Sequence, residues 1–171
     1  MFLSLIINMT KGIYLLLGSN LGDKKANLEL AKTLIQQNTG HIKRQSSIYE
    51  TAAWGKTDQP SFFNQVVEMD TSLEPRQLLV FIQQTEKEMG RVRIEKWGQR
   101  LIDIDLLYYH DTMVSSTDLT VPHPGIPERR FTLVPLVELA PDFVHPVLKK
   151  SHTALLKECK DPLKVERLLS Y

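Results

Sequence analysis

The sequence has one cysteine, almost no net charge and no long apolar run, and each shortage excludes a class of protein. Cys159 is the only cysteine, which excludes an intramolecular disulfide and a cysteine cluster for zinc or iron–sulfur. It also favours a reducing, cytoplasmic location. The formal net charge is +1 over 171 residues, so we expect no bulk attraction to nucleic acid or anionic lipid. No apolar run approaches the roughly 20 residues of a membrane-spanning helix, so we expect no membrane partner.

The chain also lacks a glycine-rich phosphate loop and a typical signal peptide. In the segment Gly18–Lys24, three residues separate the two glycines instead of four, and Asp23 stands where a phosphate loop carries lysine. Any nucleoside triphosphate must therefore be held by metal and arginines. Residues 1–8 are apolar without a basic region, so we interpret them as a candidate N-terminal extension and do not expect secretion.

What the sequence does contain is a regular succession of strand and helix patterns. Apolar spacing predicts a helix over residues 24–38, closed by Gly40, and a second helix capped by Ser72 that ends at Gly90. Strands are expected over residues 12–17, 41–50, 62–70 and 101–110. The order is β-α-β-β-α-β.

This order predicts an α+β fold with a ferredoxin-like βαββαβ core over residues 12–110, an antiparallel sheet with helices packed on one face. Residues 111–171 are expected to be C-terminal additions, with a mixed apolar segment over 129–140 and a short helix near 151–160. With 42% apolar residues, the 171 residues are expected to form a single domain around one sizeable core.

Two carboxylates stand two residues apart inside the last predicted strand. Because a strand alternates its faces, Asp103 and Asp105 point the same way, roughly 6 to 7 Å apart along the strand. Mg²⁺ prefers oxygen ligands and is usually held by one or two carboxylates together with substrate phosphates. The pair therefore indicates a magnesium site, although the solvated face of an ordinary antiparallel strand would look the same.

A cation-rich segment precedes the two aspartates. Arg91, Arg93, Lys96 and Arg100 surround Trp97 within ten residues, and such a segment can neutralise a polyphosphate while the indole stacks on a planar ring. The alternative is a solvated charged loop.

Three uncharged or weakly basic side chains fit a nucleotide or heterocycle site less specifically. His123 lies between two prolines and either contacts a phosphate or is structural. Phe62 and Asn64 share one face of a predicted strand, where the amide can read the edge of a heterocycle. The alternative places Phe62 in the core and Asn64 at a strand end.

Five segments carry a more specific pattern when they are taken together. They are Gly18–Gly22, Gln59–Asn64, Gly90–Arg93, Trp97–Asp105 and Val121–His123, the last followed by Arg129 and Phe131. In this order, over residues 12–145, they resemble the 6-hydroxymethyl-7,8-dihydropterin pyrophosphokinase family. The resemblance implies a ferredoxin-like fold and the Mg²⁺-dependent transfer of pyrophosphate from ATP to the pterin hydroxymethyl group, which releases AMP in folate biosynthesis.

The resemblance also implies roles for individual residues. Asp103 and Asp105 would bind two Mg²⁺ ions and act with Arg91 and Arg100 as catalytic residues. The residues expected to bind ATP are Gln83, Glu86, Arg93, Lys96, Trp97, Arg100, Leu106, Thr120, His123 and Arg129. Those expected to bind the pterin are Thr51, Ala52, Trp54, Phe62, Asn64, Trp97, Asp103 and Phe131. The expected partners are ATP and the pterin, bound by a monomer.

The residues alone leave two other functions open. A different two-metal phosphotransferase or nuclease would bring more than two carboxylates together. An RNA-binding ferredoxin-like module would need aromatic residues on the open sheet face and a broad basic surface, whereas this chain places acids there and is nearly neutral.

The sequence departs from the family pattern at Lys96, which replaces a common arginine, at Gln99, and at Phe62, which replaces a frequent tyrosine.

Overall fold

A central antiparallel sheet organises the computed structural model, which describes residues 11–53, 58–90 and 99–169. Its five core strands are β1 (Ile13–Ser19), β2 (His41–Gln45), β3 (Tyr49–Thr51), β4 (Phe62–Asp70) and β5 (Asp103–Tyr109). The sheet runs in the order β5-β1-β4-β3-β8, where β8 is Val165–Arg167, and β2 also pairs with β4. The predicted α+β fold with an antiparallel sheet is confirmed.

The single strand predicted over residues 41–50 is wrong, because the structure divides it at Ser46. Gln45 pairs with Val67 on β4, whereas Tyr49 pairs with Asn64. Three residues on one strand therefore oppose two on the other, which is the geometry of a β-bulge. Ser46 fits the irregular position because its N–H donates to the Val66 carbonyl and its Oγ accepts from the Val66 N–H.

Two long helices, α2 (Lys24–Thr39) and α3 (Pro75–Glu88), begin at well-formed caps. The Asp23 carboxylate accepts from the Ala26 N–H at 2.9 Å and so satisfies one free donor of α2. The predicted Ser72 cap of α3 is wrong: Glu74 occupies the cap, within a capping box completed by Gln77. Proline at the first helical position has the required φ and no N–H to satisfy, which explains why α3 begins at Pro75.

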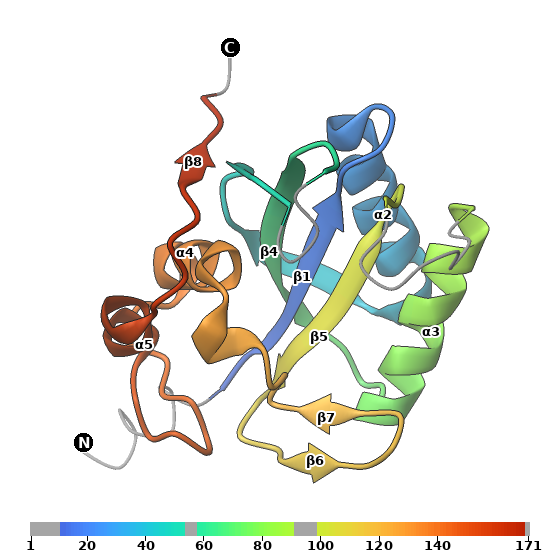
Figure 1. The fold of residues 1–171 in the computed structure, drawn as a ribbon. Coiled ribbons are helices and arrows are strands. Elements are labelled where there is room, and N and C mark those ends of the chain that lie inside the picture. The colour runs from blue at the N-terminus through green and yellow to red at the C-terminus, as the bar shows by residue number, and fades with distance from the viewer. Residues whose placement is uncertain (1–10, 54–57, 91–98, 170–171) are drawn as a thin grey trace.

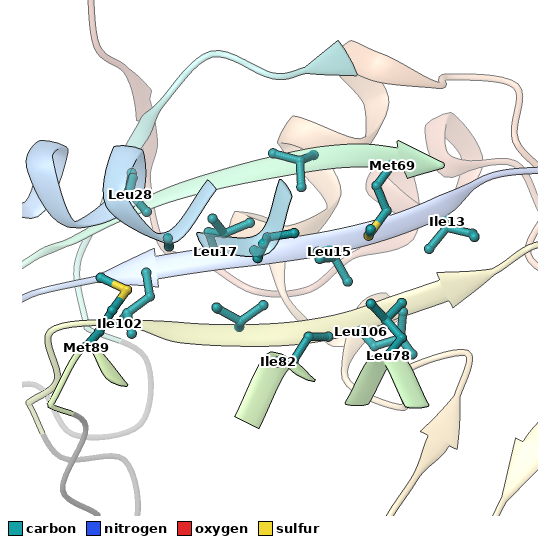
Figure 2. Close-up of a cluster of buried hydrophobic side chains, with 14 of the residues drawn as sticks. Ile13, Leu15, Leu17, Leu28, Met69, Leu78, Ile82, Met89, Ile102 and Leu106 are labelled. Carbon is teal, nitrogen blue, oxygen red and sulfur yellow. The ribbon is translucent and has the colours of Figure 1, made fainter. Parts of the chain in front are cut away.

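Helices cover both faces of the sheet (Figure 1). On one face, α2 and α3 enclose a core that includes Leu15, Leu17, Leu28, Ile82 and Leu106 (Figure 2). On the other face lie α4 (Arg130–Leu139) and α5 (His152–Glu158), over a second buried cluster that includes Tyr14, Tyr108 and Phe143. The expectation of helices on one face therefore holds for the core motif only, because the C-terminal additions cover the other face.

The chain between β5 and α4 forms a small separate layer. It contains the hairpin strands β6 (Val114–Ser115) and β7 (Thr120–Val121), followed by the 3-10 turn η1 (Ile126–Glu128). The His123 N–H donates to the Leu107 carbonyl at 2.9 Å, which ties this layer to β5. In the described part of the chain, no helix has the length and apolar character needed to cross a membrane.

Candidate active site

Two pockets meet at the start of β5. The first, which we name the aromatic pocket, has a volume of about 230 Å³. Its lining residues are Leu16, Gly18, Thr51, Ala52, Phe62, Asn64, Arg100, Asp103, Asp105, His123, Arg129 and Phe131. The second, the α3 pocket, has a volume of about 320 Å³ and lies between α3, β5 and the hairpin segment. Asp103, Asp105 and His123 line both pockets, so these three residues form the boundary between them.

The position of the two aspartates follows from the alternation of β5. Ile102 and Ile104 are buried in the core on one face, and Asp103 and Asp105 open into the pockets on the other. β5 is an edge strand of the sheet, and its outer N–H groups need partners. Glu86 on α3 supplies one, because its Oε1 accepts from the Ile104 N–H at 2.8 Å. Glu86 thus fixes the strand between the two aspartates and also lines the α3 pocket.

Gly18 on the neighbouring strand keeps the aromatic pocket open beside Asp103. The two residues are paired in the β1–β5 register. A Cβ atom at Gly18 would meet the Asn64 Oδ1 at 3.1 Å and a ring carbon of Phe62 at 3.7 Å. A side chain here would therefore crowd the Asn64 amide and occupy the space beside the Phe62 ring.

Negative charge accumulates where the pockets meet. The pKa of Asp105 is raised from 3.8 to about 7, mainly by burial and also by the nearby carboxylates of Asp103 and Glu86, against the lowering effect of Arg129 and Arg100. Arg100 lies 3.4 Å from Asp103, and Arg129 lies 3.9 Å from Asp105. The two arginines compensate the pair incompletely, which is the electrostatic condition of a cation site.

The donor set at this point is incomplete for a metal held by protein alone. Within the described ranges, no group of three or more His, Cys, Asp or Glu side chains is placed to hold an ion. Two carboxylates fit Mg²⁺, which keeps waters and takes its remaining ligands from substrate phosphates.

His123 offers a neutral hydrogen-bond donor to both pockets. Its pKa is lowered from 6.5 to about 4, mainly by burial and also by the charge of Arg129, against the raising effect of Asp103, so the ring is uncharged at neutral pH. Its Nδ1 accepts from the Gly125 N–H at 3.1 Å. The ring proton must then sit on Nε2, which can donate to a phosphate or carbonyl oxygen.

The aromatic pocket suits a flat heterocycle. Phe62 on β4 and Phe131 on α4 both line it, and each ring has an arginine nearby. The guanidinium carbon of Arg100 lies 5.6 Å from the centre of Phe62, and that of Arg129 lies 5.9 Å from the centre of Phe131. Asn64 is almost fully buried, and its Nδ2 donates to the Thr51 Oγ1 at 2.8 Å, which fixes the orientation of the amide.

Asn20, in the turn after β1, is a positioning residue that the sequence interpretation missed. Its Nδ2 donates to the Gln59 Oε1 at 3.1 Å and to the Pro60 carbonyl at 3.3 Å. Its Oδ1 accepts from the Arg100 N–H at 2.9 Å, and its own N–H donates to the Arg100 carbonyl at 3.2 Å. One buried amide thus joins the segment before β4 to the segment before β5. The sequence marks this residue only as a turn former.

Most of the site residues expected from the sequence lie in one of the two pockets. Thr51, Ala52, Phe62, Asn64, Asp103 and Phe131 of the pterin set line the aromatic pocket. Gln83, Glu86, Leu106, Thr120 and His123 of the ATP set line the α3 pocket, while Arg100 and Arg129 line the aromatic pocket. The predictions for Trp54, Arg91, Arg93, Lys96 and Trp97 lie outside the described residues.

Comparison with known proteins identifies the family. The model of the family 7,8-dihydro-6-hydroxymethylpterin-pyrophosphokinase (HPPK) matches residues 14–141, which is most of the chain. The chain belongs to the HPPK family. A 2-amino-4-hydroxy-6-hydroxymethyldihydropteridine pyrophosphokinase of Aquifex aeolicus is 41% identical over 148 residues, covering 86% of this chain and 89% of that protein. The protein of the same name from Methylorubrum extorquens is 46% identical over 132 residues, covering 77% and 84%.

Solved HPPK-DHPS structures share the HPPK fold. One, in complex with substrates, has a TM-score of 0.69 and 16% identity over 86% of this chain. Another, a triple mutant from Plasmodium falciparum, has a TM-score of 0.71 and 18% identity over 87% of this chain. At 16% and 18% identity, the likeness shows the fold alone, and the chain spans 43% of the length of each of these two solved chains.

Proposed function

We propose that this chain transfers the pyrophosphoryl group of ATP to the hydroxymethyl oxygen of 6-hydroxymethyl-7,8-dihydropterin, releasing AMP, as a step of tetrahydrofolate biosynthesis. The observation that carries the proposal is the pair Asp103 and Asp105 at the junction of two pockets. A transfer between two substrates needs one site for each and a charged centre between them. Membership of the HPPK family names the reaction.

The aromatic pocket is the proposed pterin site. Phe62 and Phe131 would stack on the ring system, since offset aromatic contacts favour flat heterocycles. Asn64, held by Thr51, would pair with the donor and acceptor edge of the pterin. Ala52 lines the same pocket, and we retain Trp54 and Trp97 as proposed pterin contacts.

The α3 pocket is the proposed ATP site. Its polar lining includes Gln83, Glu86, Thr120 and the neutral His123, and Leu106 adds an apolar surface. Arg100 and Arg129 would contact the phosphates from the other side of the two aspartates. The Nε of Arg100 is buried and has no hydrogen-bond partner within the part of the chain that the structure describes. This leaves an N–H that can donate to an oxyanion.

Asp103 and Asp105 are the proposed ligands of Mg²⁺, and we propose two ions. When bound, Mg²⁺ neutralises phosphate charge and orients the phosphate oxygens. The chain itself would act by position: the two pockets hold the pterin hydroxyl and the β-phosphorus in line, within about 3 to 3.5 Å of each other. The arginines, with Arg91, Arg93 and Lys96 from outside the described residues, would stabilise the negative charge of the transferring group.

Three further properties belong to the proposal. Residues 1–171 would form a single pyrophosphokinase domain that is active as a monomer. A cytoplasmic location fits a chain with one cysteine. The interpretation of residues 1–8 as an extension lies outside the described residues.

The test is to incubate the protein with ATP, Mg²⁺ and 6-hydroxymethyl-7,8-dihydropterin and to separate the nucleotides by chromatography. The proposal predicts AMP in amounts equal to the pterin consumed, and none when the pterin is omitted. Formation of ADP with a phosphorylated pterin would contradict it, because that product requires attack at the γ-phosphorus.

A further inference from the structure

The helix α4 is capped at its N-terminus by a carboxylate from far along the chain. The side chain of its cap residue, Arg129, does not cap the N–H groups of the first turn. Instead, Asp161 Oδ2 accepts from the Arg130 N–H at 2.9 Å, and its Oδ1 accepts from the Leu163 N–H at 3.1 Å. A helix N-terminus leaves unpaired N–H groups, which a carboxylate satisfies well.

We propose that Asp161 is a positioning residue for the aromatic pocket, an inference that rests on the proposed function of that pocket. The residues on either side of Arg130 are Arg129 and Phe131, and both line the pocket. Arg129 lies 3.9 Å from Asp105. Because Asp161 holds the backbone between them, it fixes the place of one ring and one cation of the site without touching the substrate.

The segment that contains Asp161 also reaches β3, a second element that lines the pocket. Beyond it, β8 pairs with β3, where Val165 lies opposite Thr51, a pocket residue that accepts from Asn64. Arg167 on β8 lies 3.8 Å from Glu138 on α4. Residues 161–167 therefore contact β3 and α4, the elements that carry Thr51 and Phe131. Figure 1 shows this segment running from α5 past α4 to β8.

The chemistry of Asp161 indicates a role in orientation. Its side chain is largely buried, and both carboxylate oxygens accept from backbone N–H groups, one on α4 and one on its own segment. It lies outside residues 14–141, the part that the family model matches. The C-terminal addition thus contributes to a site whose proposed ligand-binding residues all lie within that part.

The experiment compares steady-state kinetics of Asp161→Ala with the wild type in the AMP-release assay. Loss of the cap frees the first turn of α4, and we expect the KM for the pterin to rise about fivefold, the effect of a typical lost cap on the neighbouring contacts. Asp161→Asn keeps an amide oxygen that can accept from the Arg130 N–H, so its KM is expected to stay within about twofold of the wild type.

Glu158→Ala is the matched control, because it removes a carboxylate of the same C-terminal region whose ion pair is with the exposed Lys150. Glu158→Ala should leave the KM for the pterin unchanged. An unchanged KM in Asp161→Ala, with a lower Tm and a lower kcat from a smaller folded fraction, would overturn the positioning role. If that variant does not fold, Asp161→Ser, whose hydroxyl is too short to hold both donors, is tested in the same way.

The outcomes separate the two proposals. A wild-type protein that releases no AMP overturns the proposed function and, with it, the positioning role. A wild type that turns over, with a raised pterin KM in Asp161→Ala and rescue in Asp161→Asn, supports both. A wild type that turns over, with the Asp161→Ala KM at the wild-type value, overturns the positioning role alone.

Discussion

The two pockets share one boundary and differ in almost everything else. The aromatic pocket is lined by two phenylalanine rings, a fixed amide and two arginines, whereas the α3 pocket is lined by a helix face, a hairpin and polar side chains. The first is suited to a flat heterocycle and the second to a larger polar ligand. The difference teaches that the lining of each pocket is built separately, while Asp103 and Asp105 belong to both; in the proposed function, substrate choice is therefore set separately on each side.

The largest expected effect comes from removing the shared boundary. Asp103→Ala or Asp105→Ala should lower the rate of AMP release by about a thousandfold or more, because a lost metal ligand removes several kcal/mol of transition-state stabilisation. The fold should remain intact, since neither side chain belongs to a core cluster. Circular dichroism measures whether the fold is intact, and a stopped assay measures the rate of AMP release. Asp142→Ala, at an exposed position, is the control variant. Turnover close to wild type in either variant would contradict the shared role.

A second change should affect both pockets through the backbone. Asn20→Ala removes three hydrogen bonds made by a buried amide, two toward Gln59 and Pro60 and one from the Arg100 N–H. We expect kcat to fall about tenfold or more, because misplacement of a catalytic group by about 1 Å can cost a hundredfold. Asn38→Ala, which loses only a helix-surface bond to the Leu34 carbonyl, is the matched control. A fall in Asn38→Ala equal to that in Asn20→Ala would argue against this role.

Single-pocket variants should separate the two substrates. Phe62→Ala is expected to raise the KM for the pterin about tenfold, since stacking on an aromatic ring is worth about 1 to 3 kcal/mol, and to leave the KM for ATP nearly unchanged. Gln83→Ala should do the reverse, with a smaller rise of about fivefold in the KM for ATP. Initial-rate measurements with each substrate varied in turn test the pattern. If both variants shifted both constants equally, the pockets would not be separate sites.

The smallest expected effect is on stability. Because the pKa of Asp105 is raised from 3.8 to about 7, the folded protein binds this proton more tightly than the unfolded chain. The free energy of unfolding therefore falls as the pH rises from about 4 to about 7. Asp105→Asn removes this penalty, so the metal-free variant should be more stable than the wild type by about 1 to 3 kcal/mol at about pH 8 and equal to it below about pH 4. Urea unfolding at the two pH values measures the difference.

The sequence predicts those parts of the molecule that local patterns determine. The order of strands and helices and the common face of Asp103 and Asp105 follow from periods of two and 3.6 residues. The bulge at Ser46 and the cap at Glu74 escaped prediction, because each depends on a hydrogen bond whose geometry composition does not reveal. Asp161 escaped for a different reason.

Asp161 accepts a hydrogen bond from Arg130, which lies 31 residues away in the chain. No local pattern reports that distance, and the same holds for Asn20, whose partner Arg100 is 80 residues away. The covering of the second sheet face by α4 also depends on tertiary packing, although residues 129–140 looked only mixed and apolar in the sequence. Residues that line the two pockets were therefore easier to predict than residues that hold the pocket segments in place through long-range hydrogen bonds.

The most direct test of the shared boundary uses Mn²⁺, which accepts the same oxygen ligands as Mg²⁺. The protein is loaded with Mn²⁺, a non-hydrolysable ATP analogue and the pterin, and the nuclear relaxation of both ligands is measured. A cation held by Asp103 and Asp105 lies next to both pockets, so the phosphorus signals of the nucleotide and the hydroxymethyl protons of the pterin should both broaden. Asp103→Asn should reduce both effects. Broadening of the nucleotide alone, with a sharp signal from the bound pterin, would contradict the central claim.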